Sequence, residues 1–211
     1  METKRILLVD DHIVVLKGLQ LIVSEALGKE TDIDLATSGT EAIRMLRLQP
    51  YDLCILEIEL PDVDGMRMLR ALRRDHPALR RIVHTRHEQL WYMREFIDAD
   101  VDGVLFKNSD ITEISRAVNQ VLDGHKYYCM SARALKAAVD THTPPTMREM
   151  EILHLLAKGA TTEEISRQLS ISNNTTESHR RHLLEKFNAR NVAELIINAV
   201  SQGFLHIPPK G

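Results

Sequence analysis

Residues 53–65 read LCILEIELPDVDG, and this stretch decides the fold of the amino-terminal half of the chain. A short apolar run ends on Glu57 and enters a turn rich in proline, aspartate and glycine. The carboxyl ends of parallel strands meet at one edge of a sheet, where open α/β folds place their functional groups. Polar groups end three other apolar runs, ILLVDD, RIVHT and GVLFK, at Asp10 and Asp11, at Thr85 and at Lys107. If these runs are parallel strands, Glu57 lies in the middle of the polar cluster.

Amphipathic stretches alternate with the apolar runs over the first 125 residues. Leu16, Leu19, Ile22 and Val23, for example, recur at helical spacing directly after the first run. A continuous apolar run is typical of a strand that is covered on both faces. Five β-then-α units predict an α/β doubly wound five-stranded parallel sheet with right-handed crossovers. The predicted strands are 6–9, 32–37, 53–56, 82–85 and 103–106.

The rhythm changes at residues 126–145, which we predict to be a linker. This stretch contains room for a short helix over 132–139 and ends in two prolines, which cannot continue a helix. Residues 146–211 show no strand pattern and are predicted to form an all-α domain of four helices. Capping signals mark the starts of these helices: Thr146 with Glu149, Thr161 with Glu164, Ser172, and Asn191 with Glu194.

Composition places the chain among soluble, cytoplasmic proteins. It has 211 residues, a net charge of −3 and 44% hydrophobic residues. No apolar run approaches the roughly 18 residues of a membrane span, and the start lacks the apolar region of a secretory signal. Cys54 and Cys129 have no metal-binding spacing and are expected to be reduced. The charge balance by itself does not predict a nucleic-acid partner.

The motifs of residues 4–125 resemble the receiver domain of two-component response regulators, a flavodoxin-like fold and a family of phosphoproteins. VDDH, LPDVDG, the threonine that ends the fourth strand and the lysine that ends the fifth carry the resemblance. It implies that Asp10, Asp11 and residue 57 hold Mg²⁺. It implies that Lys107 pairs with phosphoryl oxygens and that Thr85 is the switch residue. A sensor histidine kinase is the implied partner.

Glu57 departs from the family, in which an aspartate at this position accepts the phosphoryl group. The extra methylene displaces the carboxylate by roughly 1.5 Å, and phosphoryl transfer depends strongly on positioning. Three interpretations remain open: an introduced phosphomimic, a naturally phosphorylation-independent regulator, and a glutamate that still accepts phosphate. The longer side chain would reach Lys107 or Thr85. Arg86 and Val104 also depart from the family, and Arg86 is expected to cover the pocket or to pair with Glu57 or Glu59.

Residues 146–206 resemble the helix-turn-helix domain of the LuxR-type, NarL/FixJ family of regulators. The run EILHLLAKGATTEEISRQLSISNNT carries this resemblance. It implies that residues 173–187 form a recognition helix that enters the major groove of double-stranded DNA. Glu177, Ser178 and Arg181 are the expected base contacts. The full set of expected DNA-binding residues is Asn174, Thr175, Glu177, Ser178, Arg180, Arg181, His182, Lys186 and Arg190.

The last predicted helix carries an apolar stripe with two interpretations. It closes the helical bundle, or it pairs two copies of the domain in a homodimer, as the resemblance implies. The residues in question are Leu195, Ile196, Ala199 and Val200.

The sequence thus predicts a cytoplasmic, DNA-binding transcription regulator and not an enzyme. An interaction protein whose receiver docks a partner without DNA binding is the alternative. A Mg²⁺ phosphatase that uses Asp10, Asp11 and Glu57 is a third hypothesis, but the sequence offers no other nucleophile and no substrate-pocket motif.

Overall fold

The computed structural model describes residues 3–28, 31–141 and 145–205. Contacts between Cα atoms divide the chain into two compact units, which are described separately. The first comprises residues 1–88 and 92–135, and the second residues 136–211 with 89–91. We call the first the receiver unit and the second the helical unit.

The receiver unit is built on one parallel sheet in the order β2-β1-β3-β4-β5-β6. Every pairing in it is parallel, and β3, β5 and most of β1 and β4 are buried. The doubly wound parallel sheet is therefore confirmed. The strands are β1 (Lys4–Val9), β2 (Thr31–Ala36), β3 (Leu53–Leu56), β4 (Arg80–Thr85), β5 (Gly103–Phe106) and β6 (Tyr127–Tyr128).

The prediction of five strands was short by one. The sixth, Tyr127–Tyr128, is only two residues long and lies in the stretch that we predicted to be a linker. Tyr127 pairs with Gly103 and Tyr128 with Val104. Two residues are too few for a period-two pattern to be recognised in a sequence. The same stretch continues into a helix, α6 (Met130–Thr141), which is longer than the predicted 132–139.

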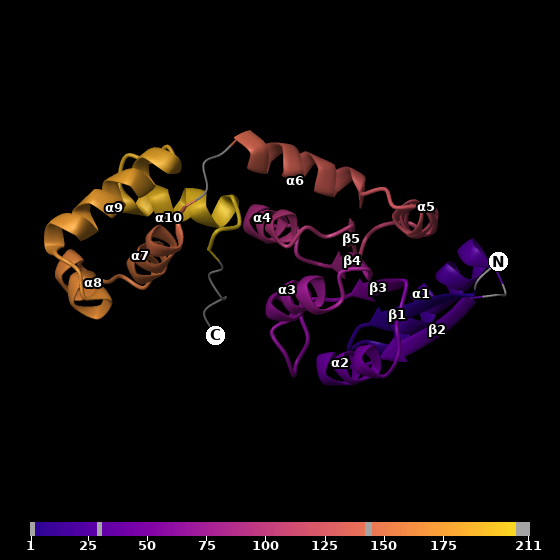
Figure 1. Ribbon diagram of the computed structural model, residues 1–211. Helices are drawn as coiled ribbons and strands as arrows, with labels where there is room; N and C mark the ends of the chain where they lie inside the picture. The colour runs from indigo at the N-terminus through magenta and orange to yellow at the C-terminus, as the bar shows by residue number, and fades with distance from the viewer. Residues whose placement is uncertain (1–2, 29–30, 142–144, 206–211) are drawn as a thin grey trace. The chain divides into compact units, whose positions relative to one another are not determined.

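Helices cover both faces of the sheet, α1 and α5 on one and α2, α3 and α4 on the other (Figure 1). Buried apolar residues at helical spacing attach them, such as Leu16, Leu19 and Val23 in the first helix. The helices are α1 (Ile13–Leu27), α2 (Gly39–Leu48), α3 (Gly65–Asp75), α4 (Leu90–Asp98) and α5 (Ile111–Leu122).

The turn after β3 is fastened by its own acidic residues. The Asp62 carboxylate accepts hydrogen bonds from the backbone N–H groups of Gly39, at 3.0 Å, and Thr40, at 2.8 Å. The bonds from Thr40 and Gly39 lower the pKa of Asp62 to about 2. Asp64 caps α3 by accepting from the Arg67 N–H at 3.0 Å. Together these bonds fix the path of the chain immediately after Glu57.

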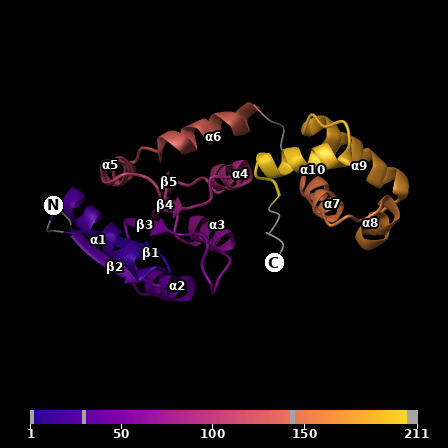
Figure 2. The same cartoon turned by 180° about the vertical axis from the view of Figure 1, so that it is seen from behind.

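Four helices make up most of the helical unit and pack around one core (Figure 2). Buried residues such as Ile152, Ile165 and Leu183 form this core. The helices are α7 (Met147–Ala157), α8 (Thr162–Leu169), α9 (Asn173–Lys186) and α10 (Val192–Ser201).

The predicted caps of these helices are present. Thr146 with Glu149 and Thr161 with Glu164 form complete capping boxes, and Ser172 caps α9. The box at Asn191 is only half formed. The Glu194 side chain accepts from the Arg190 N–H at 2.8 Å, one residue before the predicted partner.

Gly65 has no room for a side chain, which gives a test of the turn that positions Glu57. A Cβ atom at this position would lie 2.1 Å from the backbone oxygen of Ile58. Because backbone must move to relieve this overlap, Gly65→Ala should destabilise the receiver unit by about 1–3 kcal/mol. Urea unfolding followed by circular dichroism measures the change.

Gly18 provides the matched control. It lies inside α1, where an added Cβ meets nothing within 4 Å. Gly18→Ala should stabilise the protein by about 0.5–1 kcal/mol, because alanine costs less backbone entropy in a helix. Equal effects of the two substitutions would show that the turn is not tightly packed.

Candidate functional site

Two buried carboxylates share one ammonium group at the carboxyl edge of the sheet. Asp10 and Glu57 are 1% and 5% exposed. Nζ of Lys107 forms an ion pair with Oδ2 of Asp10 and lies 3.2 Å from Oε2 of Glu57. The strands position all three groups, since Glu57 N–H donates to the Val9 carbonyl and Lys107 N–H to the Thr85 carbonyl. The predicted cluster exists, and the predicted contact of Glu57 with Lys107 is confirmed.

The other oxygen of Glu57 is also engaged. Oε1 accepts hydrogen bonds from the backbone N–H groups of Ile58, at 2.7 Å, and Glu59, at 3.1 Å. The carboxylate therefore folds back onto its own loop instead of pointing out of the pocket. The alternative contact with Thr85 is not among the hydrogen bonds of the described residues. The Thr85 hydroxyl is fully buried and accepts from the His87 N–H at 3.3 Å.

The predicted Mg²⁺ ligands are not gathered as expected. Within the described residues, one group of possible metal ligands lies at this edge of the sheet. It consists of Asp10, Asp11 and His12, whose ligand atoms lie within 4.8 Å of one another. Glu57 is outside this group. Nδ1 of His12 lies 2.8 Å from Asp11 and 3.4 Å from Asp10. Two carboxylates suit Mg²⁺, but Lys107 already neutralises one of them. A three-carboxylate site with Glu57 does not fit this arrangement.

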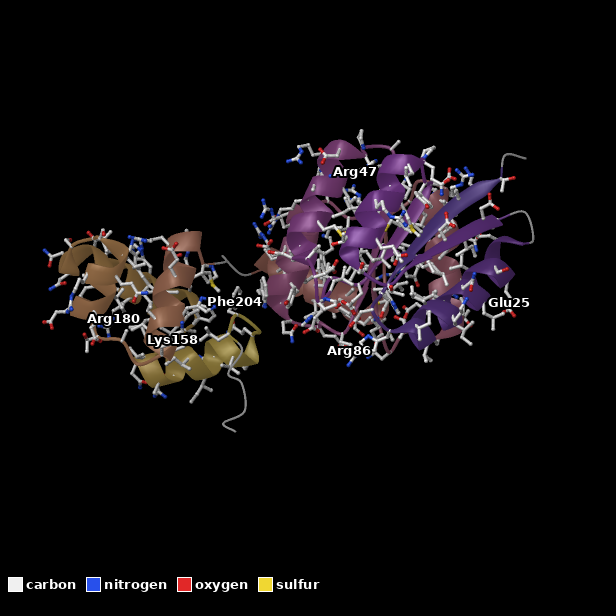
Figure 3. The ribbon with its side chains drawn as sticks, turned by 90° about the horizontal axis from the view of Figure 1, so that it is seen from below. Glu25, Arg47, Arg86, Lys158, Arg180 and Phe204 are labelled. Carbon is white, nitrogen blue, oxygen red and sulfur yellow. The ribbon has the colours of Figure 1, made fainter. Side chains whose placement is uncertain are left out.

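The rim of the pocket differs from the prediction for Arg86. That side chain is exposed, as Figure 3 shows, and no ion pair joins it to Glu57 or Glu59 among the described contacts. His87 takes the place instead, with Nε2 at 3.2 Å from the Glu59 carboxylate. Its ring stacks on Tyr92 with centroids 4.2 Å apart. No sequence signal predicts this contact, because a single histidine after a strand has no recognisable spacing.

Many of the predicted DNA-binding side chains on α9 already have partners inside the helical unit. Oε1 of Glu177 accepts from the Thr162 hydroxyl at 2.5 Å and from Nη1 of Arg180 at 2.8 Å. Arg190, which follows α9 in the chain, pairs with Glu194. By contrast, Asn174 and Arg181 are exposed and Ser178 is partly exposed, and none of the three forms a side-chain hydrogen bond or ion pair among the described residues. These three side chains are therefore available for contacts outside the helical unit. Thr175 is also exposed, and its hydroxyl contacts the Ser172 cap at 2.8 Å.

Lys186 has a structural role that the sequence did not reveal. Its Nζ lies 2.6 Å from Oε2 of Glu149, which is 3% exposed. Removing this lysine would leave a buried carboxylate without its cation, which is costly. Thr176 also behaves as a core residue. Its hydroxyl lies 2.7 Å from that of Ser166 and donates to the Ser172 carbonyl at 3.3 Å, the backbone acceptor that a buried hydroxyl needs.

The predicted dimer stripe on α10 divides into two classes. Leu195 and Ala199 are completely buried within the helical unit and therefore belong to its core. Their burial fits the interpretation that the stripe closes the helical bundle, and the dimer role stays a prediction for the exposed part of the stripe. Val200, at 37% exposed, and the partly exposed Ile196 remain accessible. Ile197, which the prediction omitted, is 67% exposed.

Comparison with protein families agrees with this geometry. Residues 6–119 match the response regulator receiver domain, and residues 145–199 match the luxR family of bacterial regulatory proteins. The chain belongs to the two-component response regulators with a LuxR-type domain. This family consists of DNA-binding transcription regulators and not of enzymes. No helix in the described part of the regulator is long and apolar enough to cross a membrane.

Relatives match the regulator over nearly its whole length. The transcriptional activator protein ExaE of Pseudomonas putida is 32% identical over 96% of this chain and 98% of its own. The transcriptional regulatory protein UhpA of Salmonella typhimurium is 31% identical over 89% and 93%. The fold is similar to that of RcsB in a structure of two RcsB dimers bound to two parallel DNAs, with a TM-score of 0.70 and 23% identity. That match covers 95% of this chain and 99% of the other.

A buried histidine behind the pocket should make the regulator sensitive to acid. His84 is 4% exposed, and its Nδ1 has no partner among the described residues. Burial, and then the Lys107 charge, lower the pKa of His84 to about 4. The unfolded chain has a histidine pKa of about 6.5 and so binds more protons between these values. Stability should therefore fall as the pH drops from about 6.5 to about 4.

Urea unfolding at a series of pH values in this window measures the effect. His84→Leu removes the titrating group and should flatten the slope, whereas His154→Ala, at an exposed histidine of α7, should retain it. A parent protein with constant stability over this window would contradict the assignment.

Proposed function

We propose that this regulator binds double-stranded DNA as a homodimer through α9, with a receiver whose charge state is set by Glu57 and not by phosphorylation. The contact between Oε2 of Glu57 and Nζ of Lys107, at 3.2 Å, carries the proposal. In the family this lysine pairs with the phosphoryl group. Here the Glu57 carboxylate takes the place of the phosphoryl group as the partner of this lysine. It supplies one charge and two oxygens, whereas a phosphoryl group supplies nearly two charges and three oxygens.

Glu57 is poorly placed to act as the phosphoryl acceptor. Oε1 is held by two backbone N–H groups and Oε2 faces Lys107. Attack would require an oxygen to leave these partners and align with a phosphodonor, and loss of alignment costs phosphoryl transfer much of its rate. Of the three interpretations of Glu57, we therefore favour the phosphomimic and the phosphorylation-independent regulator, which both predict the same charge pattern.

Mg²⁺ should have a reduced role in this receiver. Family members bind the ion at the phosphorylation site, where it offsets clustered negative charge. Here the Lys107 ammonium pairs with both Asp10 and Glu57 and already offsets one of their two negative charges. Asp11, partly exposed beside His12, is the carboxylate most accessible to a cation. We therefore propose weak Mg²⁺ binding at Asp10 and Asp11, with Glu57 outside the coordination shell.

The partners follow from the two domains. We propose a receiver over residues 1–125 that docks a cognate sensor histidine kinase and a DNA-binding domain over 146–211, with the segment 126–145 between them. A cytoplasmic location is consistent with both partners. The RcsB structure with dimers on DNA supports DNA binding and dimer formation in a protein of this fold. On α10, Val200 and Ile197 are the best exposed apolar candidates for the dimer surface.

The accessible face of α9 suits the major groove. Arg181 is exposed, and an arginine can bridge O6 and N7 of a guanine. Ser178 and Asn174 lie toward the amino-terminal half of the helix, which is the half that approaches base edges. The Glu177 carboxylate accepts hydrogen bonds from Arg180 on the same helix and from Thr162 on α8. These bonds orient α9 against α8 before any contact with DNA. His182 and Thr175 suit phosphates.

Phosphorylation by a small donor tests the role of Glu57. Incubation with acetyl phosphate and Mg²⁺, followed by intact-mass measurement, should leave the parent protein unmodified. Glu57→Asp should gain one phosphoryl group, because Asp10, Asp11, Thr85 and Lys107 remain in place. Calorimetry should also show tighter Mg²⁺ binding by this variant. A stoichiometric mass gain on Glu57 of the parent would reject the proposal.

DNA binding should weaken steeply with salt, because log affinity falls by about 0.9 per phosphate contact for each unit of log salt. Arg181→Ala should cost roughly 1–3 kcal/mol on sites selected from random DNA and relax the preference at one base pair. Fluorescence anisotropy with labelled duplexes measures both effects. Lys186→Ala is a poor probe, because it breaks the ion pair with buried Glu149.

Arg47→Ala is the matched control for Arg181→Ala. It removes the same charge from an exposed position on α2 of the receiver unit (Figure 3) and should leave DNA affinity unchanged. Absence of salt-dependent DNA binding by the parent would favour the alternative, an interaction protein that works through its receiver.

A further inference from the structure

Two histidines of α9 and a buried glutamate of α7 lie together in the helical unit. Ligand atoms of Glu149, His179 and His182 lie within 4.8 Å of one another. We propose that these three side chains form a binding site for a transition-metal ion, for which Zn²⁺ is the best match. The site is independent of the phosphoacceptor pocket, and only His182 also belongs to the proposed DNA-binding set.

Helix geometry brings the two histidines to one face. Residues three positions apart on a helix are neighbours on its surface, so His179 and His182 point the same way. Nδ1 of His182 lies 3.9 Å from Oε1 of Glu149. Two ligands of one tetrahedral zinc ion, each at about 2.0–2.2 Å, are separated by roughly 3.4 Å. Small side-chain rotations are therefore enough to close the site.

The glutamate is already oriented as a ligand. Its Oε2 accepts hydrogen bonds from the Thr146 N–H at 2.7 Å and from Lys186 at 2.6 Å. These bonds leave Oε1 on the side of the histidines. Burial alone raises the pKa of Glu149, but Lys186 and Thr146 outweigh it and hold the pKa below its usual range. The group is therefore an ionised carboxylate with fixed orientation, and such outer bonds strengthen metal sites.

The donor set selects the class of metal. Two imidazole nitrogens and one carboxylate oxygen suit Zn²⁺ and similar transition metals, whereas Mg²⁺ and Ca²⁺ prefer oxygen ligands alone. Three protein ligands leave a fourth position for water. His182 is exposed and His179 partly exposed, so the ion can enter from solvent. The Lys186 ammonium on the same carboxylate opposes a second cation, so the affinity should be lower than that of a four-ligand structural site.

A bound ion would fasten α9 to the start of α7. The Glu149 carboxylate already joins these two helices through Lys186. A metal ion bound to this carboxylate would also be bound by His179 and His182 of α9, which adds a second link between the helices. A ligand that binds only the folded state raises the unfolding temperature by mass action. The measurable consequence is a zinc-dependent rise in the thermal stability of the helical unit.

The test uses the full chain, stripped of metal with a chelator, at neutral pH in a buffer that does not bind zinc. Zn²⁺ is titrated by calorimetry, and thermal unfolding is followed with and without the ion. The parent should bind one ion at this site and unfold at a higher temperature with it. His182→Ala and His179→Ala should each lower the affinity of this site at least tenfold and remove the temperature shift, whereas Mg²⁺ should produce no shift in the helical unit.

Two control variants separate this site from other histidines. His12→Ala disables the second candidate group, formed with Asp10 and Asp11 in the receiver unit. His154→Ala removes an exposed histidine of α7 that is outside the site. Both controls should retain the zinc-dependent shift. If His179→Ala and His182→Ala bind zinc as the parent does, or if His12→Ala abolishes the binding, the proposal is overturned. No DNA is present, so this result is independent of the proposed function.

Discussion

Two buried carboxylates share one ammonium group at the edge of the receiver sheet, and the rest of the pocket depends on that shared ion pair. Isolated charges as buried as Asp10 and Glu57 are very costly, so a cation must accompany them. Lys107 supplies it from the end of β5. The parallel register of β1, β3, β4 and β5 places these groups together. A substitution that removes the carboxylate at position 57 therefore changes the charge around Lys107 and not only the chemistry of one side chain.

The helical unit uses the same principle at a different place. Glu149 is buried at the start of α7, closes a capping box with Thr146 and holds Lys186 at the end of α9. One carboxylate thus helps to cap the start of α7 and also holds the end of α9 in place. The orientation of α9 relative to α7 follows from this pair, and the bonds of Glu177 and Arg180 with Thr162 add the orientation relative to α8.

The sequence predicted the parts of the structure that rest on periodicity and on local hydrogen bonds. The core strands, the helices and most of the caps follow from such patterns, and so does the gathering of Asp10, Glu57 and Lys107. The sequence did not predict the partners of long polar side chains. Lys186 and Arg180 have the spacing of DNA contacts, but their heads bond within the domain, because a charge-assisted contact depends on tertiary geometry.

The same limit explains the other differences. An apolar stripe on α10 has the same periodicity whether it faces the core of the domain or a partner. Only the structure shows that Leu195 is buried and Val200 is exposed. The two-residue strand β6 is too short to leave a pattern. At the pocket rim, the choice between Arg86 and His87 as the partner of Glu59 depends on where the chain turns after β4, which no spacing encodes.

The burial of the Lys107 contacts has an osmotic consequence. The side chains of Lys107, Asp10 and Glu57 are 13%, 1% and 6% exposed, so dissolved ions screen their attraction only slightly. The exposed charges of α9, such as Arg181, face water and are screened much more strongly. Osmotic stress that raises the salt concentration around the regulator would thus weaken the proposed contacts of α9 with DNA, while the receiver pocket kept its ion pairs. These contacts would recover without a new signal once the salt concentration returned to its former value.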